Sequence, residues 1–218
     1  PFGWTDPSGA EAEAIPAGGF CQELADAARR HGRMICAGVV ERAGDRIFNS
    51  AVLIDKSGEV RLVHRKVNEL EIGHGAYTLG DRLGVVETEF GRMGVMICAD
   101  AFAPGQVIAR TLGMMGARVI LSPCAWAVPP EHDNAATPYG QLWLENYGPV
   151  ARDFGLWIAG CSNVGPIRAG AWAGHRCIGN SLAVGPDGRE KLRGPHGEAA
   201  EAILYLKVTP GPEFRPKA

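Results

Sequence analysis

The stretch MGVMICADAFAPGQVIARTLGMMGARVILSP, residues 93–123, decides the fold of this chain. Residues 93–98 have the pattern of a short buried strand that ends in a loop. Pro104 then opens a predicted helix, because proline is favoured in a first helical turn, and a glycine after the apolar stripe closes it. Residues 118–123 follow as a second apolar strand. The pattern predicts a strand-helix-strand unit with Cys98 where the first strand gives way to a loop.

The remaining sequence alternates in the same manner. Further helices are predicted over residues 20–32 and 141–154, and further strands over residues 33–41, 47–55, 60–66, 85–86, 156–161, 177–185 and 201–208. Hairpins mixed with strand-helix-strand units are typical of an α/β fold with layers of helices and sheets. The length of 218 residues and the lack of a linker composition predict one domain over residues 1–218.

Composition narrows the classes of partner. Hydrophobic residues make up 46% of the chain, charged residues 21%, and the formal net charge is -2. Such a balance is typical of a soluble globular protein and gives no basic field for nucleic acid or anionic lipid. No apolar run approaches the roughly 18 residues of a membrane span, and the start of the sequence lacks a signal-peptide pattern. We therefore expect a small-molecule partner, and neither nucleic acid nor a membrane.

The six cysteines lack CxxC spacing and lie mostly in apolar, strand-like surroundings. This favours free cysteines over a disulfide framework or a zinc site, and it predicts a reducing, cytoplasmic setting. His132 with Asp133, and His175 with Cys177, have no partner pair at zinc spacing, so no metal is expected. No glycine pattern of a phosphate-binding loop is present, and no cofactor is expected either.

Met-Ile-Cys-Ala occurs twice, around Cys36 and around Cys98. Cys36 lies inside a predicted strand and is interpreted as core. Cys98 ends its strand at a turn, where a nucleophile can be presented to a substrate. A thiolate needs a nearby cation and free backbone amides, and Lys66 at the end of its strand is the candidate cation. A solvated strand-terminal lysine is the alternative interpretation of Lys66.

The segments HRKVNELEIGHGAYTLGD and TEFGRMGVMICADAFAPGQVIARTLGMMGARVILSPCAW resemble the carbon-nitrogen hydrolase (nitrilase) superfamily. The resemblance continues through WIAGCSNVG and GNSLAVGPDG and covers nearly the whole chain. It implies a four-layer α-β-β-α sandwich and pairing into a homodimer or larger homo-oligomer. The Cys-Ala-Asp sequence favours the amidase and carbamoylase branches over the nitrilases, without fixing the substrate.

The resemblance also assigns roles to residues. The family's nucleophile falls on Cys98 and its lysine on Lys66, and the backbone amide of Ala99 would share the oxyanion with Lys66. Asp100, Cys124 and Trp126 would border the substrate pocket; ordinary packing is the alternative for Trp126. The implied reaction is hydrolysis of an amide or carbamoyl bond, or of a nitrile, through a cysteine thioester.

The chain departs from the family in its glutamates. The triad glutamate follows an early strand in the family, and no glutamate before Lys66 has that context. We interpret the first strand-helix-strand and this glutamate as missing, through truncation or through real loss, and we expect impaired hydrolysis. Glu71 is predicted to be a second acidic residue of the pocket. The alternative interpretation is that Glu71 is a solvated carboxylate of the loop.

Two other functions remain open at this point. A catalytically silent domain of the same fold would act in binding or assembly. A protease-like Cys-His site would pair Cys98 with His64 or His132 as the base, and would make Lys66→Ala a mild change.

Overall fold

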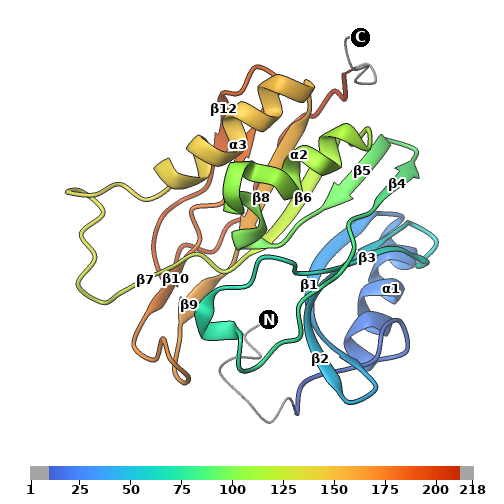
Figure 1. Ribbon diagram of the computed structural model, residues 1–218, viewed down its shortest axis with the longest axis horizontal. Coiled ribbons are helices and arrows are strands. Elements are labelled where there is room, and N and C mark those ends of the chain that lie inside the picture. The colour runs from blue at the N-terminus through green and yellow to red at the C-terminus, as the bar shows by residue number, and fades with distance from the viewer. Residues whose placement is uncertain (1–9, 212–218) are drawn as a thin grey trace.

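The computed structural model describes residues 10–211, and its largest element is a six-stranded sheet (Figure 1). Its strands, in the order β12-β11-β8-β6-β5-β4, are β12 (Glu190–Arg193), β11 (Leu182–Val184), β8 (Trp157–Ser162), β6 (Val119–Cys124), β5 (Gly91–Val95) and β4 (Val85–Thr88). The central strands β5, β6 and β8 run parallel, and the outer pairs are antiparallel. The carboxyl ends of the parallel strands therefore meet at one edge, where ligands bind in open α/β sheets.

One face of this sheet is covered by helices α2 (Val107–Met114) and α3 (Gln141–Phe154) (Figure 1). Two short 3-10 turns, η3 (Cys98–Phe102) and η4 (Pro104–Gln106), connect β5 to α2. The core between helices and sheet contains Trp126 stacked on Trp143, with ring centroids 4.5 Å apart. The unit predicted from residues 93–123 therefore forms, but its first strand ends at Val95, and Cys98 lies three residues further on, at the start of η3.

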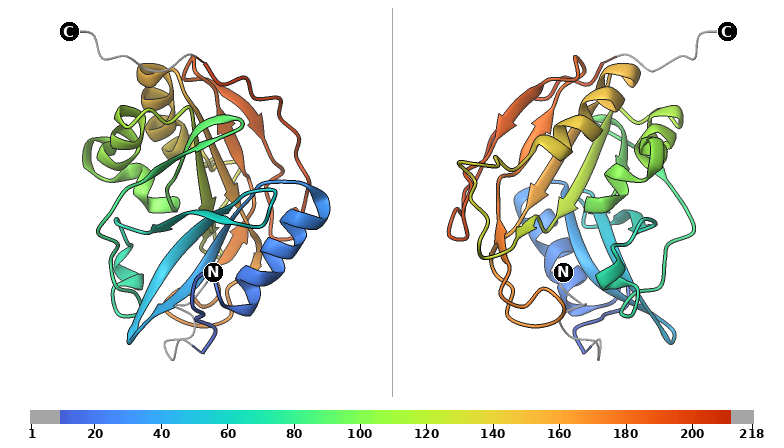
Figure 2. Two further views of the ribbon diagram at one scale, coloured as in Figure 1. Left: turned by 90° about the vertical axis from the view of Figure 1, so that its right-hand side faces the viewer. Right: turned by 60° about the vertical axis from the view of Figure 1, so that its left-hand side comes forward.

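A second sheet packs on the other face. It consists of β1 (Ile35–Ala43), β2 (Arg46–Ile54) and β3 (Val60–Arg65), and helix α1 (Gly19–His31) covers its outer side. Strand β2 shows why the sheet has two buried faces. Val52 and Ile54 pack under α1, whereas the alternate residues Ala51 and Leu53 pack against Val95 of the large sheet. The layers are helix, sheet, sheet, helix, as Figure 2 shows from the side, and the predicted α-β-β-α sandwich is confirmed.

A small third sheet and one further turn complete the fold. Strands β7 (Ala127–Val128), β10 (Arg176–Ile178) and β9 (Val164–Pro166) pair in that order, beyond the carboxyl ends of β6 and β8. The turn η2 (Glu71–Gly73) lies in the loop that follows β3. Both features lie beside the edge at which Cys98 is found (Figure 1).

Some strands differ from the prediction. The strand expected over residues 177–185 is broken into β10 and β11, because Gly179 and Asn180 between them have φ values of 62° and 57°. Strands β7, β9 and β12 were not predicted. The strand expected over residues 201–208 does not form: this segment makes no backbone hydrogen bonds to another strand of residues 10–211, and Tyr205 is 87% exposed. A run of apolar residues does not make a strand where no neighbouring strand pairs with it.

Across residues 10–211, no helix combines the length and apolar character that spanning a membrane requires.

Candidate active site

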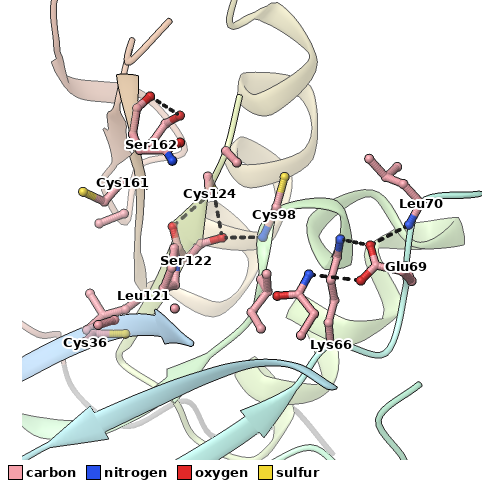
Figure 3. Close-up of a pocket in the computed structure, with 18 of the residues that line it drawn as sticks. Cys36, Lys66, Glu69, Leu70, Cys98, Leu121, Ser122, Cys124, Cys161 and Ser162 are labelled. Carbon is pink, nitrogen blue, oxygen red and sulfur yellow. Dashed lines mark hydrogen bonds and ion pairs between the residues drawn. The ribbon is translucent and has the colours of Figure 1, made fainter. Parts of the chain in front are cut away.

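Cys98 is the first residue of η3 and has a left-handed backbone, with φ of 45°. This region is costly for a residue with a Cβ atom, by roughly 1–3 kcal/mol, and such strain clusters at active sites. The turn takes the chain out of β5 abruptly, so the half-buried Cys98 side chain lies at the sheet edge instead of continuing along the strand. Cys98, Cys124 and Lys66 line the same pocket, and Figure 3 shows Cys98 between the other two.

The surroundings of Cys98 favour its thiolate. A hydrogen bond from the Cys124 thiol lowers the pKa of Cys98, against the effect of burial, and the charge of Lys66 lowers it further. The backbone amides of Ala125 and Ala99 also hydrogen bond to the sulfur and add to the lowering of this pKa. Burial and the neighbouring sulfur raise the pKa of Cys124 well above its ordinary value. The surroundings thus favour Cys98 as the thiolate of the pair and Cys124 as the protonated thiol that donates to it.

Lys66 follows β3 directly and is only 4% exposed. Its Nζ lies 2.5 Å from Oε1 of Glu69, which is also buried. Asn49 donates its side-chain amide to Oε2 of Glu69 at 3.0 Å, and the backbone amide of Leu70 donates to Oε1 at 2.9 Å. The carboxylate is therefore fully engaged and holds the lysine ammonium at the pocket. An ammonium in this position is suited to stabilise negative charge on a reacting atom.

Asp100 lies beneath the site as a completely buried carboxylate. Its Oδ1 accepts hydrogen bonds from the backbone amides of Val67 and Asn68, at 3.1 and 2.8 Å. Its Oδ2 accepts from the amide of Ile97 at 2.8 Å and lies 2.7 Å from Nε2 of His64. Asp100 thus ties the loop after β3 to the turn after β5, and those two segments carry the lysine and the cysteine.

The pocket between the two sheets has a volume of about 450 Å³. Its lining is mostly apolar, with four cysteines, Cys36, Cys98, Cys124 and Cys161. Within residues 10–211, Lys66 and Glu69 are the only charged side chains that line it. The same part of the chain contains no group of three or more His, Cys, Asp or Glu side chains suited to a metal ion.

Several residues lie elsewhere than the sequence led us to expect. Glu71 is exposed at the start of η2 and does not line the pocket; Glu69 has the buried position instead. Trp126 is 1% exposed and packs into the helical side of the sheet, because β6 ends before it and its ring turns toward Trp143. Asp100 is also absent from the lining, because its oxygens are taken by backbone amides. Cys124 does line the pocket.

The two histidines weighed as bases lie outside the pocket. His64 is bound to Asp100 in the core, and His132 lies beside His196, with ring centroids 6.2 Å apart. Neither geometry places an imidazole against the thiol. The Cys-His site considered from the sequence has no support in this arrangement.

Sequence reasoning missed three contacts. Glu69 accepts a hydrogen bond from Lys66, Asn49 donates to Glu69, and Ser122 accepts the backbone amide of Cys98 at 3.2 Å. Of these, only the contact of Glu69 could have been predicted from the sequence, because Glu69 lies three residues after Lys66 in a loop that must fold back on the end of the strand. Asn49 and Ser122 lie on strands whose neighbours are set by the sheet pairing.

Comparison with known proteins places the chain in a family. A match to the carbon-nitrogen hydrolase family covers residues 2–210, and the chain belongs to this family. It is 30% identical to the chloroplastic omega-amidase of Arabidopsis thaliana over 203 residues, 86% of this chain and 51% of that protein. It is 33% identical to a nitrilase of Pyrococcus abyssi over 205 residues, 89% of this chain and 69% of that protein.

Solved structures agree with this placement. The carbon-nitrogen hydrolase from Helicobacter pylori G27 superposes with a TM-score of 0.71 at 27% identity, over 82% of this chain and 65% of that one. Nit3 of Saccharomyces cerevisiae, a member of branch 10 of the nitrilase superfamily, has a TM-score of 0.69 at 20% identity, over 88% and 67% of the two chains. The chain spans about half the length of the omega-amidase that it matches.

Proposed function

We propose that this chain cleaves a carbon–nitrogen bond of a small amide or carbamoyl compound, with Cys98 as the nucleophile. The observation that carries the proposal is the position of Cys98, on a strained turn at the carboxyl end of β5, with Lys66 and two backbone amides around its sulfur. The family's relatives include an omega-amidase and a nitrilase. A nitrile remains a second substrate class, since the pocket lining does not separate the two.

The proposed reaction has two steps. The Cys98 thiolate attacks the carbonyl carbon, and the negative charge that forms on oxygen is stabilised by the Lys66 ammonium and the Ala99 amide. The carbon–nitrogen bond then breaks, the nitrogen takes a proton from the solvent and leaves as ammonia or an amine, and a thioester remains on Cys98. Water attacks the thioester, the carbon–sulfur bond breaks, and the acid leaves with the thiolate restored and one proton returned to the solvent.

Glu69 limits the second step in this proposal. It is the only carboxylate of residues 10–211 in the pocket, and its oxygens are already bound by Lys66, Asn49 and Leu70. Water activation by a general base contributes roughly 10²- to 10⁴-fold to a rate. We therefore expect the thioester to form faster than it is hydrolysed, with slow turnover by this chain alone.

The first test measures the nucleophile by intact mass. A solved variant of the Nesterenkonia amidase, 22% identical to this chain with a TM-score of 0.63, carries the acetamide moiety of fluoroacetamide on its active-site cysteine. We expect fluoroacetamide to add one acetamide group to this chain, at Cys98, with loss of fluoride. Lys66→Met should slow the addition severalfold, whereas Lys56→Met, at an exposed ion pair with Glu89, should not.

The second test measures turnover. Ammonia release from a panel of short neutral amides should be slow and should disappear in Cys98→Ser, while a thioester adduct accumulates in the unsubstituted chain. Equal labelling of several cysteines, or an unchanged rate in Lys66→Met, would contradict the assignment of Cys98 and Lys66. Selective labelling with neither an adduct nor ammonia would favour a silent domain that binds small molecules or takes part in an assembly.

We further propose self-association and a reducing compartment, such as the cytoplasm, for this chain. The outer side of the helical layer exposes large apolar side chains, among them Val107, Met114 and Leu142 at 55%, 63% and 50%. Such patches are typical of protein interfaces. All six cysteines are free, and the proposed mechanism needs Cys98 as a thiol.

A further inference from the structure

The nucleophile has a second thiol beside it, and the sheet register explains why. Strands β5 and β6 are parallel neighbours in which Val95 pairs with Leu121. Cys124 is the last residue of β6, and Cys98 begins the turn η3 that follows β5, so both cysteines lie where neighbouring strands end. Neighbouring strands are about 4.8 Å apart. A disulfide requires the two cysteines to be close neighbours, and the hydrogen bond between the Cys124 thiol and the Cys98 sulfur brings these two side chains into contact.

Ser122 links the two cysteines. Its hydroxyl accepts the backbone amide of Cys98 at 3.2 Å and lies 3.4 Å from the sulfur of Cys124. The Cys124 sulfur also lies 3.2 Å from the carbonyl oxygen of Ser122, so it is held close to that strand. Both cysteines line the pocket, into which a small reagent fits (Figure 3).

We propose that Cys98 and Cys124 are a reversible oxidation site, in which a hydroperoxide that enters the pocket converts the two thiols into a disulfide. This inference rests on the proposed function only in taking Cys98 as the reactive thiol of the pocket. The pair meets the usual description of an oxidation-sensitive site, a stabilised and accessible thiolate next to a second thiol that resolves the first product.

The oxidation has two balanced steps. The Cys98 thiolate attacks one oxygen of the hydroperoxide, the O–O bond breaks, and the products are Cys98 sulfenic acid and, after protonation, an alcohol or water. Cys124 sulfur then attacks the Cys98 sulfur, the S–S bond forms, and the hydroxyl group leaves as water with the Cys124 proton. Two thiols lose two electrons, and the peroxide gains them. A dithiol reductant reverses the change by thiol–disulfide exchange.

The other two cysteines of the pocket are less suited. Burial raises the pKa of the Cys36 thiol to about 12, so Cys36 is protonated at neutral pH. Cys36 and Cys161 also lie on strands β1 and β8 of different sheets. Attack on a peroxide requires the thiolate, and we therefore expect oxidation to begin at Cys98.

The test uses the full chain, limiting hydrogen peroxide, and a denaturing quench with N-ethylmaleimide. Non-reducing peptide mapping should show a peptide pair joined through Cys98 and Cys124, a loss of two free thiols per chain, and recovery of both after dithiothreitol. Cys124→Ser should instead carry Cys98 to the sulfinic acid, which dithiothreitol does not recover. Cys161→Ser should behave as the unsubstituted chain does.

Other results overturn the inference. Sulfinic acid at Cys98 in the unsubstituted chain with Cys124 still free would do so, and so would a bond from Cys98 to Cys161. Both of these results are measured on the unsubstituted chain, so they test the inference even if a variant does not fold. Fluoroacetamide labelling of the reduced chain separates the two proposals. If Cys98 is labelled but no disulfide forms, only the oxidation site is contradicted. If Cys98 is not labelled, the proposed function is contradicted.

Discussion

Cys98 lies between a neutral thiol and a buried ammonium, and both stabilise its anion. The hydrogen bond from Cys124 and the charge of Lys66 lower the pKa of Cys98, so its thiolate fraction should rise with pH through a midpoint below that of an ordinary thiol. The rate of alkylation by fluoroacetamide follows that fraction. We predict a rate that rises and levels off at lower pH than the rate of a small model thiol.

The pH profile of the alkylation rate in variants identifies which group lowers the pKa of Cys98. Lys66→Met removes the positive charge, so its midpoint should move to higher pH, while Lys56→Met should leave the midpoint in place. A profile of the unsubstituted chain that coincides with the model thiol would show that the surroundings of Cys98 do not stabilise its anion. Stopped samples measured by intact mass across pH give all three curves.

Residue spacing predicted some side chains of the site and failed for others, for a physical reason. Cys98 and Lys66 each end a strand, and the sheet then fixes where they lie. Glu69 and Glu71 both lie in a loop, and only the folded loop decides that the first is buried and the second exposed. Asp100 was expected at the pocket because it is close in sequence to the nucleophile, yet backbone amides draw its oxygens into the core.

At the scale of elements, the contact of α2 with α3 depends on one glycine. A Cβ atom at Gly113 would lie 2.6 Å from the ring of Phe154, which is buried between helix and sheet. Overpacking costs roughly 1–3 kcal/mol, and the better helix propensity of alanine offsets up to about 1 kcal/mol. We predict that Gly113→Ala lowers the free energy of unfolding by about 1–2 kcal/mol.

The matched control is Gly75→Ala. A Cβ atom there meets no atom within 4 Å, so its effect should stay within about 0.5 kcal/mol. Urea unfolding followed by circular dichroism measures both variants. A Gly113→Ala variant as stable as the unsubstituted chain would mean that the two helices separate easily, against the packing described above.

Elements were predictable where local pattern and pairing agree. The strand-helix-strand unit of residues 93–123 has both its own apolar pattern and neighbours on each side, and it forms as predicted. The segment 201–208 has an apolar run alone, and it stays unpaired within residues 10–211. Strand β12, which pairs with β11, has no such pattern in Glu190–Arg193, so pairing alone creates it.

At the scale of the whole molecule, the two helical layers differ in what they expose. The layer of α2 and α3 presents Met114 and Leu142, at 63% and 50% exposure, whereas α1 on the opposite side presents Phe20 at 46%. A two-fold pairing uses the same surface on both copies, so lysines in that surface would face each other and repel. We predict that Met114→Lys combined with Leu142→Lys shifts a dimer to the monomer.

The control places one lysine on the other layer. Phe20→Lys should leave the dimer intact, because α1 lies on the far side of the sandwich (Figure 2). Sedimentation velocity over a range of protein concentrations measures the mass of each variant, and fluoroacetamide labelling of Cys98 checks that the site is still formed. Dissociation by Phe20→Lys, with the double variant still dimeric, would place the interface on α1. If the unsubstituted chain is a monomer at all concentrations, pairing through either helical layer is excluded. Burial of the apolar side chains is then too weak to offset the translational and rotational freedom that two molecules lose when they associate.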